Sequence, residues 1–429
     1  MISNPYIEAY SNKEVSFKYR GRYYNFSLSQ ELFSSADIDG GSRFLLKVFS
    51  DYLDKRFAKT ISSGPFSVLD AGSGTGVLGI CAAGAISQAF QARDIHVRAQ
   101  DRDELARVFT KHNAERNGFP ENVLEACTEP LLSGPAGQKW DLILTNIPAK
   151  AGAPVLEDFV RRSASLLKKD GLVFLVAVNT LAHFFRESIA EAKAPLASEE
   201  TGKEHTVFVY GGIDETGSPI LFDEGFPQNY PFYIRNRDSY KIENISYRLD
   251  TVYGAPGFDN PGGSTEAAAK LALKIDLASR PIPAGAKLLV HGDNQGHFAL
   301  WLAHYLNGDS SILLSGRNIL ALGAARQNLS ASFPGKNIAV IPAADIFPSE
   351  NIRKDKKFNL IAVFPESLAD IEKTWENLGY FSAPGCIIIV GMASAGAERF
   401  NNKKNPAFTR LGDVKRHGFR ALAYVMRQE

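Results

Sequence analysis

The residues best suited to chemistry stand together in the segment FSVLDAGSGTGVLGI, residues 66–80. A short apolar run from Phe66 to Leu69 is long enough for one strand buried on both faces. It leads through the carboxylate of Asp70 into a glycine-dense turn, and an apolar helical pattern begins at Val77. Glycines let a backbone approach a ligand closely, and a helix N-terminus offers unpaired N–H groups to oxygen atoms. We therefore expect a nucleotide-type ligand at this turn.

The spacing of the glycines narrows the class of ligand. A dinucleotide-binding turn reads GxGxxG, whereas Gly72, Gly74 and Gly76 fall as GxGxG. The Lys-Ser or Lys-Thr pair that completes a phosphate-binding P-loop does not follow. The pattern D-x-G-x-G-x-G resembles the cofactor loop of class I S-adenosylmethionine (SAM) methyltransferases. The resemblance implies that Asp70 and the three glycines hold the methionine end of the cofactor.

Polar residues after the next two predicted strands complete the expected cofactor site. The strand from Ile95 to Gln100 ends at Asp101, where an acidic side chain can accept hydrogen bonds from both ribose hydroxyls. We expect Arg102 to belong to the cofactor site as well. Asp103 is expected to cap the following helix, and it is the alternative acceptor for the ribose. Methyltransferases often place a polar side chain after the third strand to meet the adenine amino group, and Thr128 is the candidate here.

A second motif, TNIPAKAGAPV, follows the fourth predicted strand at residues 145–155. It resembles the [DNS]-P-P-[FYW] turn of amino-methylating enzymes, in which the amide oxygen and the next carbonyl accept hydrogen bonds from the target NH2 group. The resemblance implies catalytic roles for Asn146, Ile147 and Pro148, by orientation and proximity rather than by a strong base. Ile147 replaces the first proline, and Ala149 offers no aromatic face to a base.

The segment from Leu32 to Phe49 carries a third motif and an expected helix cap at Asp39. Together with Asn146, Pro148, Ala151 and Gly152, it resembles the small-domain RNA guanine-N2 methyltransferases; the residues that match here are Phe33, Ser34, Asp39, Gly41, Ser42, Leu45 and Leu46. In that family this turn lies over the cofactor, which implies cofactor contacts for Ser34 and Asp39. Lys150 stands where the family has arginine, and Lys150 and Arg43 are expected at the substrate; a solvated surface lysine is an equally good interpretation of Lys150.

Composition sets the broad class of protein. The chain has 429 residues, 45% of them hydrophobic and 22% charged, which predicts a soluble chain of two domains. Three cysteines in apolar surroundings, no signal pattern and no membrane-length apolar run predict a cytoplasmic protein. A net charge of +1 means that any nucleic-acid contact must come from a local basic patch.

The second half repeats the order of elements at an offset of about 220 residues, which indicates tandem duplication. The predicted fold is α/β, with two tandem Rossmann-like, doubly wound, mostly parallel sheets, each ending in an antiparallel edge strand; His205–Tyr210 is expected to be that edge strand in the first half. The domains are predicted at 1–225, catalytic with an N-terminal hairpin, and 226–429, catalytically silent. The functional positions of the second half have changed: Val290 stands for Asp70, Asn294 for Gly74, Gly316 for Asp101 and Phe364 for Asn146. His291 and His297 are interpreted as turn residues, not metal ligands.

The whole chain thus resembles the two-domain ribosomal RNA guanine-N2 methyltransferases, although in those enzymes the active copy is the C-terminal one. The expected function is SAM-dependent methylation of an exocyclic amine, foremost guanine N2 of ribosomal RNA, with SAM as cofactor, RNA as partner, and no metal or membrane. Adenine-N6 methylation, protein glutamine-N5 methylation and a non-catalytic SAM-binding or ribosome-associated scaffold remain alternatives. An RNA enzyme should gather Lys18, Arg20, Arg22, Arg43 and Lys150 around one mouth.

Overall fold

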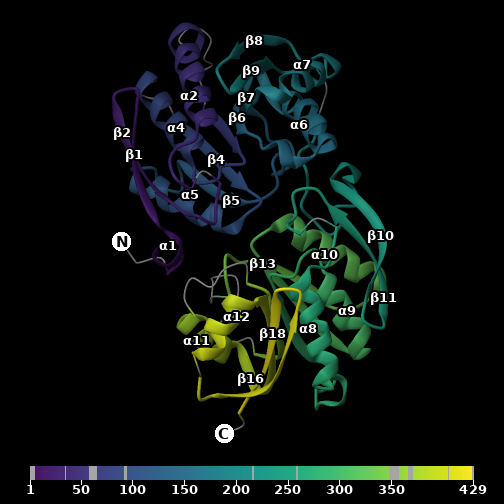
Figure 1. The fold of residues 1–429 in the computed structure, drawn as a ribbon. Helices are drawn as coiled ribbons and strands as arrows, with labels where there is room; N and C mark the ends of the chain where they lie inside the picture. Colours follow the sequence, from purple (N-terminus) through teal and green to yellow (C-terminus); the bar gives the residue numbers. More distant parts are fainter. Residues whose placement is uncertain are drawn as a thin grey trace. The chain divides into compact units, whose positions relative to one another are not determined.

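The computed structural model describes residues 5–33, 35–57, 65–90, 94–214, 217–257, 259–346, 357–365, 371–403 and 405–427 (Figure 1). The chain divides into two compact units, Met1–Phe222 and Asp223–Glu429. The division lies between residues 222 and 223, and the sequence analysis placed the boundary between 225 and 226.

The first unit is built on a seven-stranded sheet in the order β5-β4-β3-β6-β7-β9-β8. All neighbouring strands from β5 to β7 are parallel. Every residue of β3 is buried, as its apolar sequence predicts for a central strand. The elements in chain order are α1 Pro5–Tyr10, β1 Lys13–Tyr19, β2 Arg22–Leu28, α2 Gly40–Tyr52, the π-helical turn η1 Leu53–Phe57, β3 Phe66–Ala71, α4 Val77–Ala89, β4 Ile95–Asp101, α5 Glu104–Arg116, β5 Leu124–Thr128, β6 Trp140–Asn146, η2 Ala149–Ala151, α6 Ala153–Ser165, β7 Leu167–Val178, η3 Asn179–Leu181, α7 Ala182–Glu191, β8 Leu196–Thr201 and β9 His205–Gly211.

The edge of this sheet differs from the expectation in one respect. Strand β9 runs antiparallel to β7, as predicted for His205–Tyr210, but β8 pairs outside it and forms the edge. The sequence of β8, LASEET, has no continuous apolar run, and none of its residues is fully buried. A polar strand without a fully buried residue lacks the apolar periodicity by which strands are recognised, so the sequence does not predict it.

The predicted hairpin of β1 and β2 is docked onto α5 by two asparagines one helical turn apart. The Asn113 amide accepts from the Ser27 N–H at 2.8 Å and donates to the Ser27 carbonyl at 3.1 Å. Asn117 makes the same pair of bonds with the backbone of Asn25, at 2.9 and 2.8 Å. Residues i and i+4 share a helix face, and i and i+2 share a strand edge, so the two amides complete the outer edge of β2.

The second unit repeats the arrangement, with a seven-stranded sheet in the order β14-β13-β12-β15-β16-β18-β17 and a separate hairpin of β10 and β11. The fold class predicted from the sequence is confirmed for both halves. The elements are η4 Pro231–Tyr233, β10 Ile234–Ile242, β11 Ile245–Val252, α8 Gly263–Lys274, η5 Leu277–Ser279, β12 Ala286–His291, α9 His297–Leu306, β13 Ser310–Gly316, α10 Ile319–Ser332, β14 Ile338–Pro342, β15 Phe358–Val363, α11 Ile371–Phe381, β16 Ser382–Ala393, α12 Ser394–Asn402, β17 Phe408–Arg416 and β18 Phe419–Met426.

The hairpin of the second unit is held by the counterpart of Asn113. The Asn328 amide accepts from the Asp250 N–H at 2.9 Å and donates to the Asp250 carbonyl at 3.0 Å. It also donates to the Gln295 carbonyl, as Asn113 does to the carbonyl of Thr75. The same docking contact in both halves supports their origin by duplication.

Replacing Asn113 by alanine should loosen the first hairpin. The change leaves the buried N–H and carbonyl of Ser27 without partners, a cost of about 1–3 kcal/mol. Amide hydrogen exchange over residues 13–28 should therefore accelerate, measured by mass spectrometry. The matched variant Asn328→Ala should accelerate exchange over residues 245–252 and leave 13–28 unchanged. Unchanged exchange over 13–28 in Asn113→Ala would show that the amide does not hold the hairpin.

Candidate functional site

The turn between β3 and α4 requires glycine at its three glycine positions. Gly72, Gly74 and Gly76 have φ of 84°, 56° and 86°, in the left-handed region that residues with a Cβ rarely adopt. A Cβ on Gly76 would also lie 3.3 Å from the Cα of Thr110, whereas a Cβ on Gly74 would meet nothing within 4 Å. Gly76 therefore allows α5 to pack against the turn, and Gly74 leaves its open side free for a ligand.

Two acidic side chains border this turn at the carboxyl ends of adjacent strands. Asp101 accepts from the Gly74 N–H at 3.0 Å and from the Asp103 N–H at 3.0 Å, so it fixes the turn that it borders. Asp70 is fully buried; its Oδ2 accepts from the Gly79 N–H at 2.7 Å, and its Oδ1 has no hydrogen-bond partner among the described residues. Asp103 caps α5 by accepting from the Leu105 N–H, as the sequence predicts.

The environment disfavours the charged form of both carboxylates. Burial raises the pKa of Asp70 to about 7, against the hydrogen bond from Gly79 and with a further increase from the nearby charge of Asp101. Burial likewise raises the pKa of Asp101, and the charge of Arg102 opposes that increase. A cation beside this pair would offset the cost of burying negative charge. SAM carries an ammonium and a sulfonium, so the orphaned Asp70 oxygen and the open glycine turn fit this cofactor.

The predicted Asn146 turn lies beside the glycine turn and is held by α2. Asn146 Nδ2 donates to Asp39 Oδ1 at 2.8 Å and to Ser42 Oγ at 3.2 Å. Asp39 caps α2 by accepting from the Ser42 N–H at 2.9 Å, as predicted for this position. The neighbouring Thr145 hydroxyl donates to the Ala71 carbonyl at 2.8 Å, which ties the end of β6 to the end of β3. Two motifs separated by more than a hundred residues thus meet in one site.

The first departure from the amino-methylating motif has a structural explanation. Ile147 is 3% exposed, so its side chain contributes to the core while its backbone keeps a carbonyl at the turn. Pro148, Ala149 and Lys150 are exposed. Nothing in the structure explains why alanine stands at 149.

A small cleft joins the glycine turn to Asn146. Its lining residues are Leu28, Phe33, Asp37, Ile38, Asp39, Ser42, Gly72, Ser73, Gly74, Thr75, Val77, Leu78 and Asn146. Its volume is about 50 Å³, well below the roughly 300–1,000 Å³ of sites for ligands of this size. A bound cofactor therefore needs more room than this cleft provides. Phe33 is 71% exposed and presents an aromatic ring at the cleft.

Thr128, Arg43 and Arg102, which the sequence also predicts for the site, are not among the residues that line this cleft. The Thr128 hydroxyl donates to Glu104, and Arg43 pairs with Asp37 at 2.9 Å. Arg102 is half-buried beside Asp101. Ser34 lies outside the described residues. The roles assigned to these residues and to Lys150 stay predictions.

The expected basic mouth includes arginines that make contacts within the first unit. Arg20 pairs with Asp54 at 2.7 Å, and Arg22 lies over the rings of Tyr24 and Phe119. Lys18 lies over the ring of Tyr23. These contacts fix the hairpin side chains, and an RNA-binding patch stays a prediction.

The sequence analysis missed two residues that shape the site. Thr110 on α5 donates to the Gly74 carbonyl at 3.1 Å and supports the glycine turn from behind. The His205 ring lies over the start of α2, where a Cβ on Gly41 would be 3.2 Å from its Nε2 and 3.1 Å from Asp39 Oδ1. Neither residue belongs to a recognisable motif, because each contact depends on elements that are distant in the sequence.

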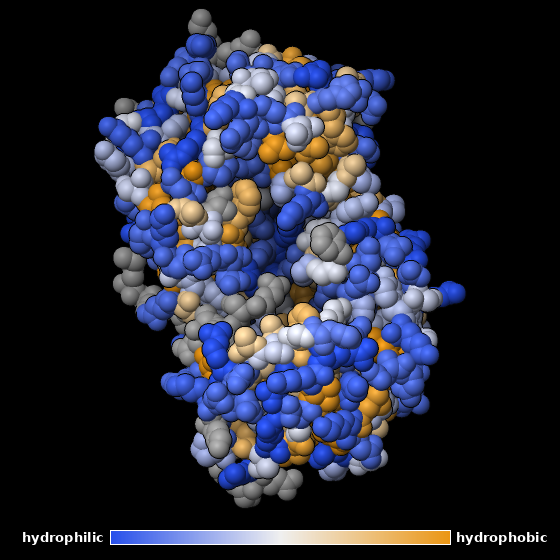
Figure 2. Space-filling model, in the orientation of Figure 1, coloured by the Kyte–Doolittle hydropathy of each residue, from blue (hydrophilic) through white to orange (hydrophobic). Residues whose placement is uncertain are grey.

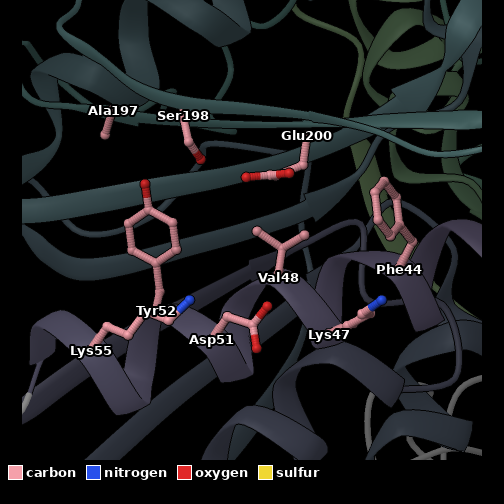
Figure 3. Close-up of a pocket in the computed structure, with 9 residues that line it drawn as sticks. All are labelled: Phe44, Lys47, Val48, Asp51, Tyr52, Lys55, Ala197, Ser198 and Glu200. Atoms are coloured by element: carbon pink, nitrogen blue, oxygen red, sulfur yellow. The ribbon is translucent and has the colours of Figure 1, made fainter.

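A second cavity of about 350 Å³ lies between α2 and β8 (Figure 3). Lys47 and Asp51 line it from α2 and Lys55 from η1, and Glu200 faces them from the strand. Tyr52 points from α2 toward Ala197 and Ser198 of the strand. The lining carries both signs of charge and contains none of the predicted site residues.

The fold, the glycine turn and the acidic pair define a class I SAM-dependent methyltransferase.

No helix within the described residues is long and apolar enough to cross a membrane. The face in Figure 2 is mostly hydrophilic, with apolar side chains in small groups. Those residues also contain no group of three or more metal-ligating side chains.

Comparisons with known proteins agree with this class. The sequence profile of the methyltransferase small domain matches residues 24–193. The uncharacterized protein YbxB of Bacillus subtilis is 30% identical over 167 residues, which are 39% of this chain and 75% of that protein. A ribosomal protein L11 methyltransferase of Staphylococcus carnosus is 33% identical over 105 residues, 24% of this chain and 30% of that protein. The chain belongs to the methyltransferase small-domain family.

A solved structure shares the fold of both halves. It is the T. thermophilus 16S rRNA N2 G1207 methyltransferase in complex with AdoMet and guanosine, with a TM-score of 0.60 over 98% of this chain and 100% of that chain. The two are 16% identical, so the likeness concerns the fold.

Replacing Asp70 by asparagine should separate ligand binding from stability. The raised pKa of Asp70 means that its stabilising contribution is present below its unfolded pKa and is lost as pH rises toward about 7. Asp70→Asn removes this titration, so its melting temperature should exceed that of the wild type by more at pH 8 than at pH 5. Its affinity for SAM should fall roughly ten- to hundredfold, as expected for a lost hydrogen bond to a charged group.

The control is Asp293→Asn in the second unit. Asp293 is also buried with a pKa raised to about 7, but both its oxygens accept backbone N–H groups, from Phe298 and Ala299. Its replacement should destabilise the protein and leave SAM affinity unchanged. Calorimetric titration and thermal denaturation measure both effects. Full SAM affinity in Asp70→Asn would contradict the role of the orphaned oxygen.

Proposed function

We propose that the first unit transfers a methyl group from SAM to an exocyclic amino group of a nucleobase, with guanine N2 of ribosomal RNA as the substrate. The observation that carries this proposal is the free oxygen of the Asn146 side chain. The Asn146 amide donates its N–H groups to Asp39 Oδ1 and Ser42 Oγ, and its oxygen accepts no hydrogen bond within the described residues. Asn146 lines the same cleft as the glycine turn. A free acceptor beside a cofactor turn suits a substrate that brings N–H donors.

We propose that the site promotes the transfer by orienting the amine of the substrate. Bound SAM supplies an electrophilic methyl group. We assign the methionine end of SAM to Asp70 and to the turn of Gly72, Gly74 and Gly76. The ribose is assigned to Asp101 and Arg102, and the adenine to Thr128. Ser34 and Asp39 belong to the segment that covers the site. Asn146 Oδ1 and the Ile147 carbonyl accept the two N–H groups of the amine, and Pro148 fixes the turn. This arrangement directs the nitrogen lone pair and accommodates the positive charge that develops on nitrogen.

Three observations favour a nucleobase as the amine carrier. Phe33 offers at the cleft the aromatic face that Ala149 does not provide. Aromatic stacking on single-stranded or flipped-out bases is a common mode of RNA recognition. The fold neighbour over the whole chain is an enzyme named for guanine N2 methylation of 16S rRNA. Arg43 and Lys150, both exposed, are the proposed phosphate contacts. Action on ribosomal RNA implies a cytoplasmic protein.

We propose that the second unit, residues 226–429, is catalytically silent. Asp293 stands in its turn and occupies the N–H groups of Phe298 and Ala299 at the start of α9. Phe364, which replaces Asn146, packs on Phe298 with ring centroids 5.0 Å apart. A Cβ on Gly292 would lie 2.3 Å from the Phe364 carbonyl. These contacts support our proposal that groups of the second unit itself fill the place that the first unit leaves for a ligand.

A second candidate is methylation of a protein side-chain amide or amine. The relative from Staphylococcus carnosus methylates ribosomal protein L11 by its name, and the net charge of this chain is only +1. The amino group at N6 of adenine is a third candidate for the group that receives the methyl at the same turn. The methylated product distinguishes these substrates.

Calorimetric titration tests the cofactor site first. We expect one SAM site per chain, weakened at least about tenfold by Asp101→Ala. Asn146→Ala and Asn294→Gly should leave SAM affinity nearly unchanged, because neither side chain is proposed to touch the cofactor. Two sites per chain would contradict a silent second unit, and no binding would contradict the enzyme.

A transfer assay with isotope-labelled SAM tests the substrate. Wild-type protein should label ribosomal RNA, and nuclease digestion should yield N2-methylguanosine; Asn146→Ala should lower kcat about a hundredfold or more with SAM affinity retained. N6-methyladenosine or N5-methylglutamine as the product would assign one of the other substrates. Binding of SAM without transfer to RNA or protein would identify a non-catalytic scaffold.

A further inference from the structure

The side-chain amide of Asn146 has an accepting end and a donating end, and its neighbours determine which end faces the cleft. Asp39 Oδ1 lies 2.8 Å from the nitrogen of that amide. A carboxylate accepts hydrogen bonds and cannot donate them, so it binds the amide nitrogen and rejects the amide oxygen. The oxygen of Asn146 is thereby left as the end available to a substrate.

Asp39 is itself fixed by its place in the fold. Its Oδ1 accepts from the Ser42 N–H at 2.9 Å as the N-cap of α2, a helix that packs its buried face on the sheet. The backbone before it is held by Arg43, whose Nε donates to the Ile38 carbonyl at 2.9 Å. The His205 ring covers Gly41 on the other side of the cap. The Asp39 oxygen is therefore a rigid reference point for the amide.

The orientation matters for the reaction proposed above. An exocyclic amine presents N–H donors, which need an acceptor in the site. A reversed Asn146 amide would place N–H groups against N–H groups and would repel the positive charge that develops on the amine nitrogen. Holding the amide in one orientation removes that competing arrangement before the substrate binds.

We propose that Asp39 is a positioning residue that fixes the orientation of the Asn146 amide, and that it restricts position 146 to asparagine. This inference rests on the proposed function of the site. It assigns Asp39 a contact with a catalytic residue in place of the cofactor contact predicted from the sequence. Aspartate is excluded at position 146 because its carboxylate would lie against that of Asp39.

Reciprocal exchange of the two residues tests the proposal. Asn146→Asp alone should lower kcat about a hundredfold or more, because the new carboxylate faces that of Asp39 without a donor between them. The double variant Asp39→Asn/Asn146→Asp restores a donor–acceptor pair with the amide on the opposite side, and asparagine is a good N-cap. Its kcat should recover at least about tenfold over Asn146→Asp.

A third variant separates the cap from the orientation. Asp39→Ser keeps a residue that caps helices well, but its hydroxyl is too short to reach Asn146. It should lower kcat about tenfold or more, with melting temperature and SAM affinity close to the wild type. The control is Asp51→Asn, an exposed acid on the same helix that does not line the cleft with Asn146. It should leave kcat, melting temperature and SAM affinity unchanged.

The outcomes discriminate between the inference and the proposed function. Wild-type protein that transfers no methyl group would remove the proposed function itself. Active wild type with no recovery in the double variant, or full kcat in Asp39→Ser, would overturn the positioning role alone. A loss of SAM affinity in Asp39→Ser that matches its loss of rate would return Asp39 to the cofactor site.

Discussion

The hydrogen bond between Asp39 and Asn146 joins the two motifs of the site, and it depends on the arrangement of the first unit. Asp39 begins the helix that covers the sheet, and Asn146 ends a strand in its centre. Their contact requires α2, β6 and the turn after β3 to meet at the carboxyl ends of the parallel strands. Ligands bind at this edge in doubly wound sheets, because the helix N-termini and strand ends converge there.

The glycine turn shows how a backbone is built for a ligand. Its φ values favour glycine, so the turn is held by its surroundings rather than by its own side chains. Asp101 binds one of its N–H groups, and Thr110 and Asn113 bind two of its carbonyls. The same Asn113 docks the N-terminal hairpin, so the hairpin and the cofactor turn share one support.

Comparison of the two units separates structural from functional constraint. Both keep glycine at the helix N-cap, with φ of 86° at Gly76 and 93° at Gly296, and both keep the asparagine that docks a hairpin. They differ in their buried acids, which stand at different positions: Val290 takes the place of Asp70, and Asp293 takes the place of Ser73. Asp70 keeps an oxygen without a partner, whereas Asp293 satisfies both of its oxygens within its own unit. An unsatisfied buried charge costs stability, and a ligand can offset that cost.

The sequence by itself determined the fold class, the central strands, the glycine turn and the family, because these depend on local signals: apolar runs, residues that permit positive φ, and motif spacing. The sequence did not predict the edge strand β8, because its polar residues carry no apolar pattern. It also did not predict the support from Thr110 and His205, since these contacts join residues that are distant in the chain. The sequence also identified Asp39 and Asn146, but as members of two separate motifs, one expected to contact the cofactor and one expected to bind the amine. Only the tertiary structure decided that they bind each other, because the direction of an amide is set by the neighbour that packing places beside it.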